Sequence, residues 1–263
     1  MPGRINYARE LEFARRLATA AGANARHIRA SGVSAETKAD TSPVTIADRE
    51  NERMVREAIE SEFPADGILG EEGSSKAGSG RRRWIVDPID GTRDFVRGNR
   101  FWCILIALEE DDEPVVAVAH FPMLDETYWA VRGAGSYLNQ SRLRVSPIDS
   151  INSCVFSPNG LHLVEARPFL PAVMEFMQRS WAVRSYGGPL DACMLAAGMV
   201  DIWFEPKLEV WDLAALKLII EEAGGDFFAL DGSRRIDRGT ALACAPGISA
   251  HVLEAFGMIP ALR

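Results

Sequence analysis

The chain has 263 residues, 47% of them hydrophobic and 25% charged, a balance typical of folded globular proteins and not of disordered ones. Its formal net charge of −8 argues against nucleic acid as a partner, because phosphate backbones are bound by basic surfaces. No stretch approaches 18 uninterrupted apolar residues and the first residues form no apolar signal core, so we expect no membrane span and a cytoplasmic location.

Two helices and a β-rich block are predicted for the first half. Apolar residues at helical spacing indicate a helix over residues 5–30, and a second helix follows over 45–63. The basic run 81–83 is interpreted as a solvated loop. The predicted strands are 67–70, 84–86, 102–110, 114–121 and 127–131, with a Ser/Gly-rich mobile loop at 74–80 after the first.

Helices and strands alternate in the second half, which predicts helices that cover a sheet. We expect one domain over 1–263, made of subdomains at approximately 1–148 and 149–263 with a site in the cleft between them. The predicted helices are 166–179, 188–198, 212–223 and 248–256, and the strands are 153–156, 181–184, 201–204, 225–228 and 240–244.

The four cysteines are far apart and lie among apolar neighbours. None belongs to a C-x-x-C pair, the spacing that zinc sites and redox sites commonly use. We interpret them as reduced core thiols of a cytosolic protein. They are Cys103, Cys154, Cys193 and Cys244.

One short segment has the pattern of a metal site. An apolar strand ends in two carboxylates, Asp87 and Asp90, and Pro88 between them is predicted to stop the strand because it lacks an N–H. Carboxylates and a free carbonyl form an oxygen set that suits Mg²⁺ or Mn²⁺. Gly91 and Thr92 then begin a short helix, whose first N–H groups favour an anion. Taken alone, the two aspartates also fit a turn and a helix cap.

Further carboxylates occur where other predicted elements begin or end. Glu71 and Glu72 follow the strand at 67–70, Asp212 begins a helix, and Asp48 lies early in the second helix. Each also has a structural interpretation, because Asp212 suits a helix cap and Asp48 an exposed helix face.

Four blocks in this order resemble the inositol monophosphatase superfamily. The resemblance implies a layered α-β-α-β-α sandwich and a magnesium-dependent, lithium-sensitive hydrolase of small phosphate monoesters. It also implies two or three Mg²⁺ ions, with Mn²⁺ as a substitute, and a homodimer. The blocks are Pro43 to Asp48, Leu69 to Glu72, Trp84 to Thr92, and Val210 to Ala215 followed by Glu221 to Gly225.

The same resemblance implies the metal ligands. Glu71, Asp87 and the carbonyl of Ile89 match the ligands of a first ion. Asp87, Asp90 and Asp212 match those of a second ion. These five residues are the expected metal site.

Catalytic and phosphate-binding roles are implied in the same way. Thr92 and Glu71 match the pair that orients the attacking water, and Asp48 lies near a third ion reached through water. The amides of Gly91 and Thr92 match a phosphate-binding pair. Lys38 matches a lysine on a mobile loop of the active site.

Residues of the second half are expected to select the alcohol. Glu205 and Gly188 match family positions that face the leaving group. Arg97 belongs to a stretch that resembles the bacterial histidinol-phosphatase branch. Glu205 and Asp191 would attract the ammonium of histidinol phosphate, although the same acids would also accept hydrogen bonds from an inositol monophosphate.

Two departures from the family pattern leave other interpretations open. Asp94 stands where an asparagine is usual, and the turn from Gly188 to Asp191 differs from the commonest one. A bisphosphate phosphatase would use basic residues such as Arg93, Arg97 and Arg184, and a metal-binding scaffold without turnover is a third possibility. The apolar strands 102–108 and 115–121 are candidate dimer surfaces.

Overall fold

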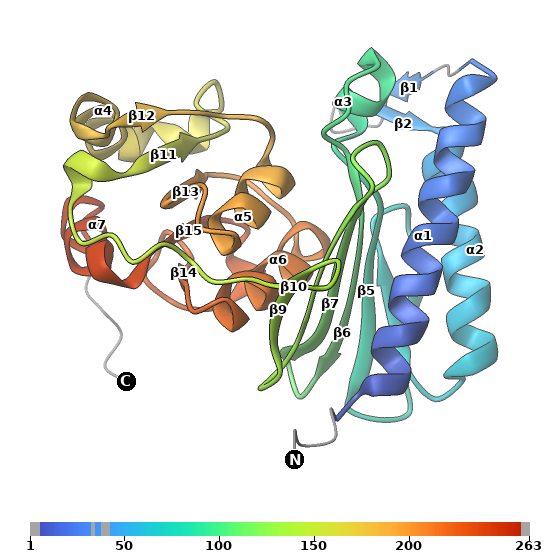
Figure 1. The fold of residues 1–263 in the computed structure, drawn as a ribbon. Helices are drawn as coiled ribbons and strands as arrows, with labels where there is room; N and C mark the ends of the chain where they lie inside the picture. The colour runs from blue at the N-terminus through green and yellow to red at the C-terminus, as the bar shows by residue number, and fades with distance from the viewer. Residues whose placement is uncertain (1–5, 33–34, 38–42, 259–263) are drawn as a thin grey trace.

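Residues 6–32, 35–37 and 43–258 are described by the computed structural model of the chain. In this part, two large sheets alternate with three layers of helices, which confirms the predicted α-β-α-β-α sandwich (Figure 1). The helices are α1 (Ala8–Ala30), α2 (Ile46–Glu62), α3 (Thr92–Arg97), α4 (Leu170–Arg179), α5 (Gly188–Ala196), α6 (Val210–Glu222) and α7 (Ser249–Ala255).

The first large sheet has the strand order β10-β9-β8-β7-β6-β5-β3-β4, and a separate hairpin joins β1 (Ala35–Thr37) to β2 (Pro43–Thr45). Every pair in the large sheet is antiparallel except β3 with β5. Its strands are β3 (Gly67–Gly70), β4 (Ser75–Lys76), β5 (Arg82–Asp90), β6 (Cys103–Glu110), β7 (Glu113–Phe121), β8 (Glu126–Val131), β9 (Gly135–Leu138) and β10 (Ser141–Arg142).

Strand β6 shows why this sheet is buried on both faces. Its side chains alternate, so Ile104 and Ile106 pack with the core beneath α1 and α2, whereas Leu105 and Ala107 pack with the core around α6. Each large apolar side chain so buried contributes roughly 1.5–3 kcal/mol to folding. The idea that β6 and β7 form a dimer surface is therefore wrong, because helices cover both faces.

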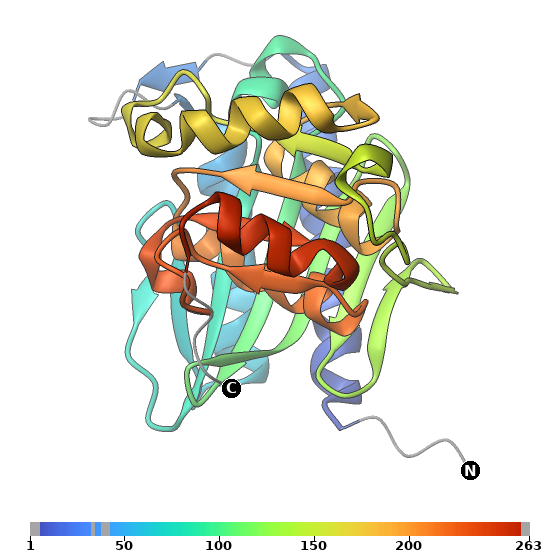
Figure 2. The same cartoon turned by 90° about the vertical axis from the view of Figure 1, so that its left-hand side faces the viewer.

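The second large sheet has the order β12-β11-β13-β15-β14, with α5 and α6 on its inner side. Figure 2 shows α4 and α7 across its outer side, where they share an apolar core with the sheet. Its strands are β11 (Val155–Pro158), β12 (Ala182–Val183), β13 (Ile202–Glu205), β14 (Asp226–Phe228) and β15 (Ala241–Cys244).

Helix α6 lies between the two sheets, and its composition explains that place. Residues Leu213 to Ile220 are buried without interruption, and all are apolar except Lys217, whose ammonium pairs with Glu113 at 2.8 Å. Its first turn carries Asp212, which thereby faces the bend at the end of β5.

Several local predictions are corrected. Pro88 does not stop β5, which continues to Asp90 with a break in register. The 74–80 loop contains β4, and the basic run is largely part of β5, where Arg83 pairs with Glu109 at 2.6 Å. Helix α4 starts four residues late because Pro168 lies in a preceding 3-10 turn.

Two further expectations concern the cysteines and membrane-spanning helices. All four cysteines are buried and unpaired. Among the residues that the structure describes, no helix is both long enough and apolar enough to cross a bilayer.

Candidate active site

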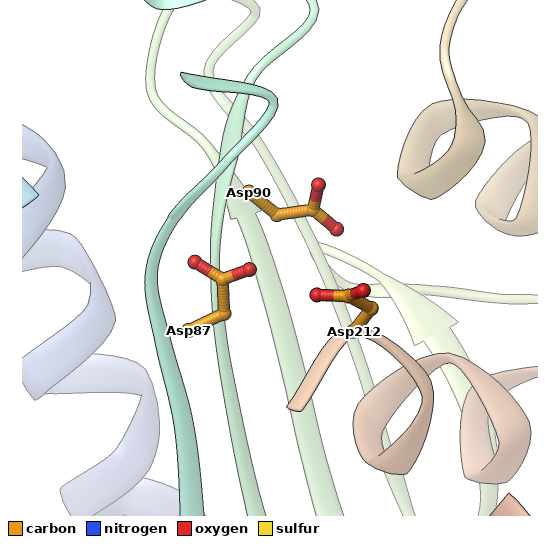
Figure 3. Close-up of side chains that lie close together, drawn as sticks. All are labelled: Asp87, Asp90 and Asp212. Atoms are coloured by element: carbon orange, nitrogen blue, oxygen red, sulfur yellow. The ribbon is translucent and has the colours of Figure 1, made fainter. Parts of the chain in front are cut away.

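Three aspartates converge where the two halves of the chain meet. Asp87 and Asp90 come from the end of β5, and Asp212 comes from the first turn of α6 (Figure 3). One carboxylate oxygen from each lies within 4.8 Å of the others. Residues more than 120 positions apart in the sequence therefore supply one acidic cluster.

An irregularity in β5 aims two of these side chains at the same point. Asp87 pairs with Leu105 and Asp90 with Cys103, so one residue more separates the aspartates than separates their partners. Such a bulge breaks the strict alternation of a strand and redirects a side chain. The amide of Ile89 donates to Asp87 Oδ1 at 2.9 Å, which fixes the bend.

Asp212 serves as a cap and as a member of the cluster. The backbone N–H of Glu209 donates to Asp212 Oδ2 at 2.8 Å, which forms half of a capping box at the start of α6. The two interpretations made from the sequence are thus compatible, because the cap uses one carboxylate oxygen.

The electrostatics of the cluster favour a cation. Burial raises the pKa of Asp87 and of Asp90 well above the ordinary value, and neighbouring carboxylates raise it further. Burial also raises the pKa of Asp212 to about 7, with Glu71 adding to the effect. Crowded, partly desolvated carboxylates with an all-oxygen donor set fit a hard divalent cation, whose charge would offset their repulsion.

Glu71 and Thr92 complete this wall. Glu71 follows β3, lines the same cavity and lies close enough to Asp87 to raise the pKa of that carboxyl. The Thr92 hydroxyl lies 3.1 Å from the carbonyl oxygen of Ile89 and 3.4 Å from Asp48 Oδ1. Its position is therefore set by both the bend and the second helix.

Asp48 lies behind the cavity wall and is fully buried. Its Oδ2 accepts hydrogen bonds from the Thr45 amide at 2.8 Å and from the Thr45 hydroxyl at 2.5 Å. Burial raises the pKa of Asp48, and these two hydrogen bonds oppose that shift. The exposed helix-face interpretation is wrong, because the side chain points inward toward Thr92.

Gly91 allows the chain to turn from the strand into α3. Its φ is +86°, which L side chains rarely adopt, and an added Cβ would lie 3.2 Å from the Trp102 Cα. In this conformation the Gly91 amide faces the Asp90 carboxyl and lowers its pKa slightly.

A cavity of about 340 Å³ extends from the acidic cluster into the second half. Both halves contribute to its walls. Of the residues expected to bind metal or a phosphate monoester, nine line it: Glu71, Asp87, Ile89, Asp90, Gly91, Thr92, Gly188, Glu205 and Asp212. Arg93, a candidate for binding a bisphosphate, lines it as well.

Glu205 is the carboxylate of the far wall. It ends β13 and is 8% exposed, and burial raises its pKa to about 8. Glycines leave room around it, because a Cβ at Gly188 would lie 2.9 Å from Glu205 Oε2 and one at Gly160 would lie 3.0 Å from Oε1. The carboxyl group therefore lies at the cavity surface between two positions without side chains.

Asp191 is placed differently from Glu205. It is fully buried on α5, and Oδ2 accepts hydrogen bonds from the Tyr186 amide at 3.0 Å, the Gly187 amide at 3.3 Å and Asn159 Nδ2 at 3.1 Å. Its carboxylate thus holds the loop before α5, and Gly187 and Asn159 of that network line the cavity.

Of the two remaining predicted residues, the structure describes Arg97 alone. Arg97 is exposed at the end of α3 and is not among the cavity-lining residues. Lys38 lies outside the described residues.

Several further cavity residues were not predicted, among them Asn159, Gly160, His162 and Lys207. They follow β11 and β13, two neighbouring parallel strands whose ends meet at one edge of the sheet. The loops after these two strands could have been predicted to meet only if the order of strands in the sheet had been known. Asp94 also lines the cavity, and its Oδ1 accepts a hydrogen bond from Asn99 Nδ2 at 2.7 Å.

Comparisons with known proteins agree with this geometry. Residues 6–257 match the model of the inositol monophosphatase family. A histidinol-phosphatase of Mycobacterium tuberculosis is 44% identical over 79% of this chain and 82% of its own length. An inositol-1-monophosphatase of Rhizobium meliloti is 40% identical over 69% of this chain and 70% of its own.

A solved structure gives the same result. The extragenic suppressor protein suhB from Bartonella henselae superposes with a TM-score of 0.89 at 30% identity, over 95% of this chain and 98% of that one. The match of the family model extends over nearly the whole chain. The chain therefore belongs to the inositol monophosphatase family of phosphoric monoester hydrolases.

Proposed function

We propose that this phosphatase hydrolyses histidinol phosphate with Mg²⁺ as its cofactor. The observation that carries the proposal is the convergence of Asp87, Asp90 and Asp212 beside Gly91 and Thr92. Carboxylates with raised pKa values form the site for cations, and the adjacent turn offers amides to a phosphate.

Two or three Mg²⁺ ions, or Mn²⁺ in their place, would be held by Glu71, Asp87, the Ile89 carbonyl, Asp90 and Asp212. Bound ions of this kind neutralise phosphate charge and lower the pKa of water at neutral pH. The oxygen-only donor set of the clustered aspartates supports this assignment. Lithium, as a competitor for one of these positions, should inhibit.

The chain's own groups would position the reactants. Thr92 and Glu71 orient the attacking water, and the Gly91 and Thr92 amides bind the phosphate oxygens. Asp48 keeps the Thr92 hydroxyl in place. Water is the nucleophile in this proposal, so none of these residues forms a covalent intermediate.

The far wall favours a cationic alcohol. Glu205 is buried, and the ammonium group of a substrate next to it would favour the ionised carboxylate. The attraction between the two charges would then contribute to substrate binding. Asp94 adds a second carboxylate to the cavity wall, and Asp191 adds negative charge behind it. The relative named histidinol-phosphatase supports the same choice.

Inositol monophosphate is the second candidate. Glu205 can accept hydrogen bonds from hydroxyl groups as well as from an ammonium. The relative named inositol-1-monophosphatase favours it. The two candidates differ in charge, so an uncharged polyol and an amino alcohol separate them.

A division of labour between the halves follows from the cavity walls. We propose that residues 1–148 bind metal and phosphate and that 149–263 select the alcohol, apart from Asp212, which joins the metal site. Asn159, Gly188 and Glu205 support the selecting role, because all three line the end of the cavity built by the second half.

A phosphate-release assay tests the proposal. Purified protein would be given histidinol phosphate, inositol 1-phosphate, fructose 1,6-bisphosphate or phosphoadenosine phosphate at fixed Mg²⁺, and then with excess chelator. We expect the highest kcat/KM for histidinol phosphate. With excess chelator we expect no phosphate release from any substrate. No release from any of the four at saturating Mg²⁺ would refute the proposal.

We also propose a cytoplasmic homodimer. The four buried, unpaired cysteines support a reducing compartment. Trp181, which is 76% exposed next to the edge strand β12, supports a further protein surface there. Light scattering on a sizing column should give twice the monomer mass, and a monomeric mass would contradict the dimer.

A further inference from the structure

One face of α2 carries three buried polar side chains, of which the sequence analysis singles out Asp48 alone. Asp48, Asn51 and Glu52 are 0%, 0% and 3% exposed. Their spacing of three and four residues places them on the same side of a helix. This side is turned toward the part of the cavity formed by Glu71, Asp87, Asp90, Thr92 and Asp212, which we call the metal wall. Each of the three residues reaches a different segment of that wall.

The three contacts are distinct. The Thr92 hydroxyl lies 3.4 Å from Asp48 Oδ1, and Asn51 Nδ2 donates to the Pro88 carbonyl at 3.4 Å. Glu52 makes the shortest contacts, to the turn between β3 and β4 that follows Glu71. A buried carboxylate therefore lies directly behind the turn that holds a proposed metal ligand.

Glu52 binds this turn through its backbone. Its Oε2 accepts a hydrogen bond from the Glu72 amide at 2.6 Å, and its Oε1 accepts one from the Ser74 amide at 2.7 Å. The turn is closed on itself by the Gly70 amide, which donates to the Ser74 carbonyl at 2.7 Å. Charge-assisted hydrogen bonds of this length are among the stronger ones in proteins.

Gly70 makes the close approach possible. A Cβ at this position would lie 2.6 Å from Glu52 Oε2 and 2.7 Å from its Cδ. The Glu52 carboxylate thus occupies the space next to the backbone just before Glu71. The nearby arginines of α2 pair with other glutamates: Arg49 with Glu36, Arg53 with Glu57, and Arg56 with Glu60.

We propose that Glu52 is a positioning residue for the metal site, which fixes the backbone on both sides of Glu71 so that its carboxylate faces Asp87. The residue touches neither substrate nor metal. It acts through the Glu72 and Ser74 amides on the C-terminal side and through close packing on Gly70 on the other. The inference rests on the proposed function, because Glu71 is a ligand only there.

The first test compares Glu52→Gln with Glu57→Gln, an exposed glutamate of the same helix. The amide replaces one acceptor by an N–H donor that opposes a backbone N–H. We expect the Mg²⁺ concentration for half-maximal phosphate release to rise about tenfold, as is usual when an outer partner of a ligand is removed. The metal-free protein should melt at a somewhat lower temperature, because a buried backbone N–H loses its acceptor, so Mg²⁺ activation is measured where both proteins are folded. Glu57→Gln should match the wild type in both.

A second variant keeps the test valid if Glu52→Gln does not fold. Gly70→Ala leaves the carboxylate in the chain and displaces it, so it should weaken Mg²⁺ activation in the same direction. Glu52→Asp keeps the charge and loses reach, so it should lie between wild type and Glu52→Gln. Wild-type Mg²⁺ dependence in the folded variants would overturn the proposal.

Hydrogen exchange separates this inference from the proposed function. In Glu52→Gln the Glu72 and Ser74 amides should lose protection, with or without Mg²⁺, while Glu57→Gln keeps it. Unchanged protection would overturn the positioning role whatever the substrate proves to be. Lost protection with unchanged Mg²⁺ activation would also overturn it, because the contact would then be merely structural. Failure of the proposed function alone would instead show as a wild-type protein without Mg²⁺-dependent phosphate release.

Discussion

The two walls of the cavity hold their carboxylates in different ways. At the metal wall, Asp87 and Asp90 stand on one bulged strand close to Asp212. Burial raises the pKa of Asp87 and of Asp90, and Asp212 raises both further. At the far wall, Glu205 stands between two glycines. Burial is the largest cause of its raised pKa, as at the metal wall, and Asp191 and Asp212 raise it further. The first wall brings three carboxylates to one point, whereas the second presents one carboxyl group, that of Glu205, at the cavity surface with Asp191 behind it.

This difference separates chemistry from selectivity. Repulsion within a crowded cluster is relieved by a cation, so the metal wall should act on any phosphate ester. A buried carboxyl at the cavity surface gains most from a complementary group on the substrate, so the far wall should distinguish among alcohols. The following changes test that separation, from the largest expected effect to the smallest.

Asp87→Asn should have the largest effect. It removes a carboxylate from the centre of the cluster, so we expect kcat/KM to fall at least about a hundredfold for every substrate. Mg²⁺ should also no longer raise the melting temperature. Asp149→Asn, an exposed aspartate, is the matched control. Wild-type turnover in Asp87→Asn would remove this residue from the proposed ligands.

Glu205→Gln should affect one substrate more than another. Removing the charge that faces the ammonium should lower kcat/KM for histidinol phosphate roughly 30-fold, or about 2 kcal/mol. Hydrolysis of a simple aryl phosphate should change little, because the metal wall is intact. Equal losses on both substrates would show that Glu205 acts on the chemistry and would break the comparison between the walls.

Gly188→Ala should have a smaller effect on the same wall. The added methyl group would press on Glu205 Oε2, and the side chain can shift to accommodate it. A cost of about 1 kcal/mol corresponds to roughly fivefold in KM for histidinol phosphate. Steady-state kinetics on both substrates measures this. An aryl phosphate affected as strongly would contradict the assignment.

Asp212→Asn should stabilise the metal-free protein. The folded pKa of Asp212, about 7, exceeds the ordinary 3.8, so the folded state holds more protons and loses stability as pH rises from about 4 to 7. The asparagine variant does not lose stability in this way, because its side chain does not ionise. Its amide oxygen can still accept the hydrogen bond from the Glu209 backbone N–H. Melting of the chelated proteins should show a gain of several degrees at pH 8 and little at pH 4. If Asp212→Asn melted at a lower temperature than the wild type at pH 8, the claim that ionised Asp212 destabilises the metal-free protein would be contradicted.

Local patterns predict many of the elements, whereas the layered fold and the grouping of Asp87, Asp90 and Asp212 were expected from the family resemblance. The apolar strand before Asp87 and the helical spacing around Asp212 place these residues at the ends of elements, and such ends tend to meet. The error at Pro88 has a physical cause. A proline within an edge or a bulge loses no essential hydrogen bond, so β5 could continue to Asp90.

The far wall could be predicted only in part. Asn159, His162 and Lys207 lie on loops that meet through the order of strands in the second sheet, which the local sequence does not encode. Asp191 and Glu205 are both acidic residues of the second half, and the sequence does not tell them apart. In the structure, however, Asp191 accepts hydrogen bonds from the Tyr186 and Gly187 amides. Only the hydrogen-bond partners distinguish a loop-holding carboxylate from one that faces the cavity.

The most direct test measures phosphate release from histidinol phosphate and from inositol 1-phosphate across a Mg²⁺ series, with wild type and Glu205→Gln in parallel. The two-wall account predicts release that requires Mg²⁺ in both proteins, with a preference for histidinol phosphate that Glu205→Gln largely abolishes. Release that persists with excess chelator, or a preference that survives in Glu205→Gln, would contradict it.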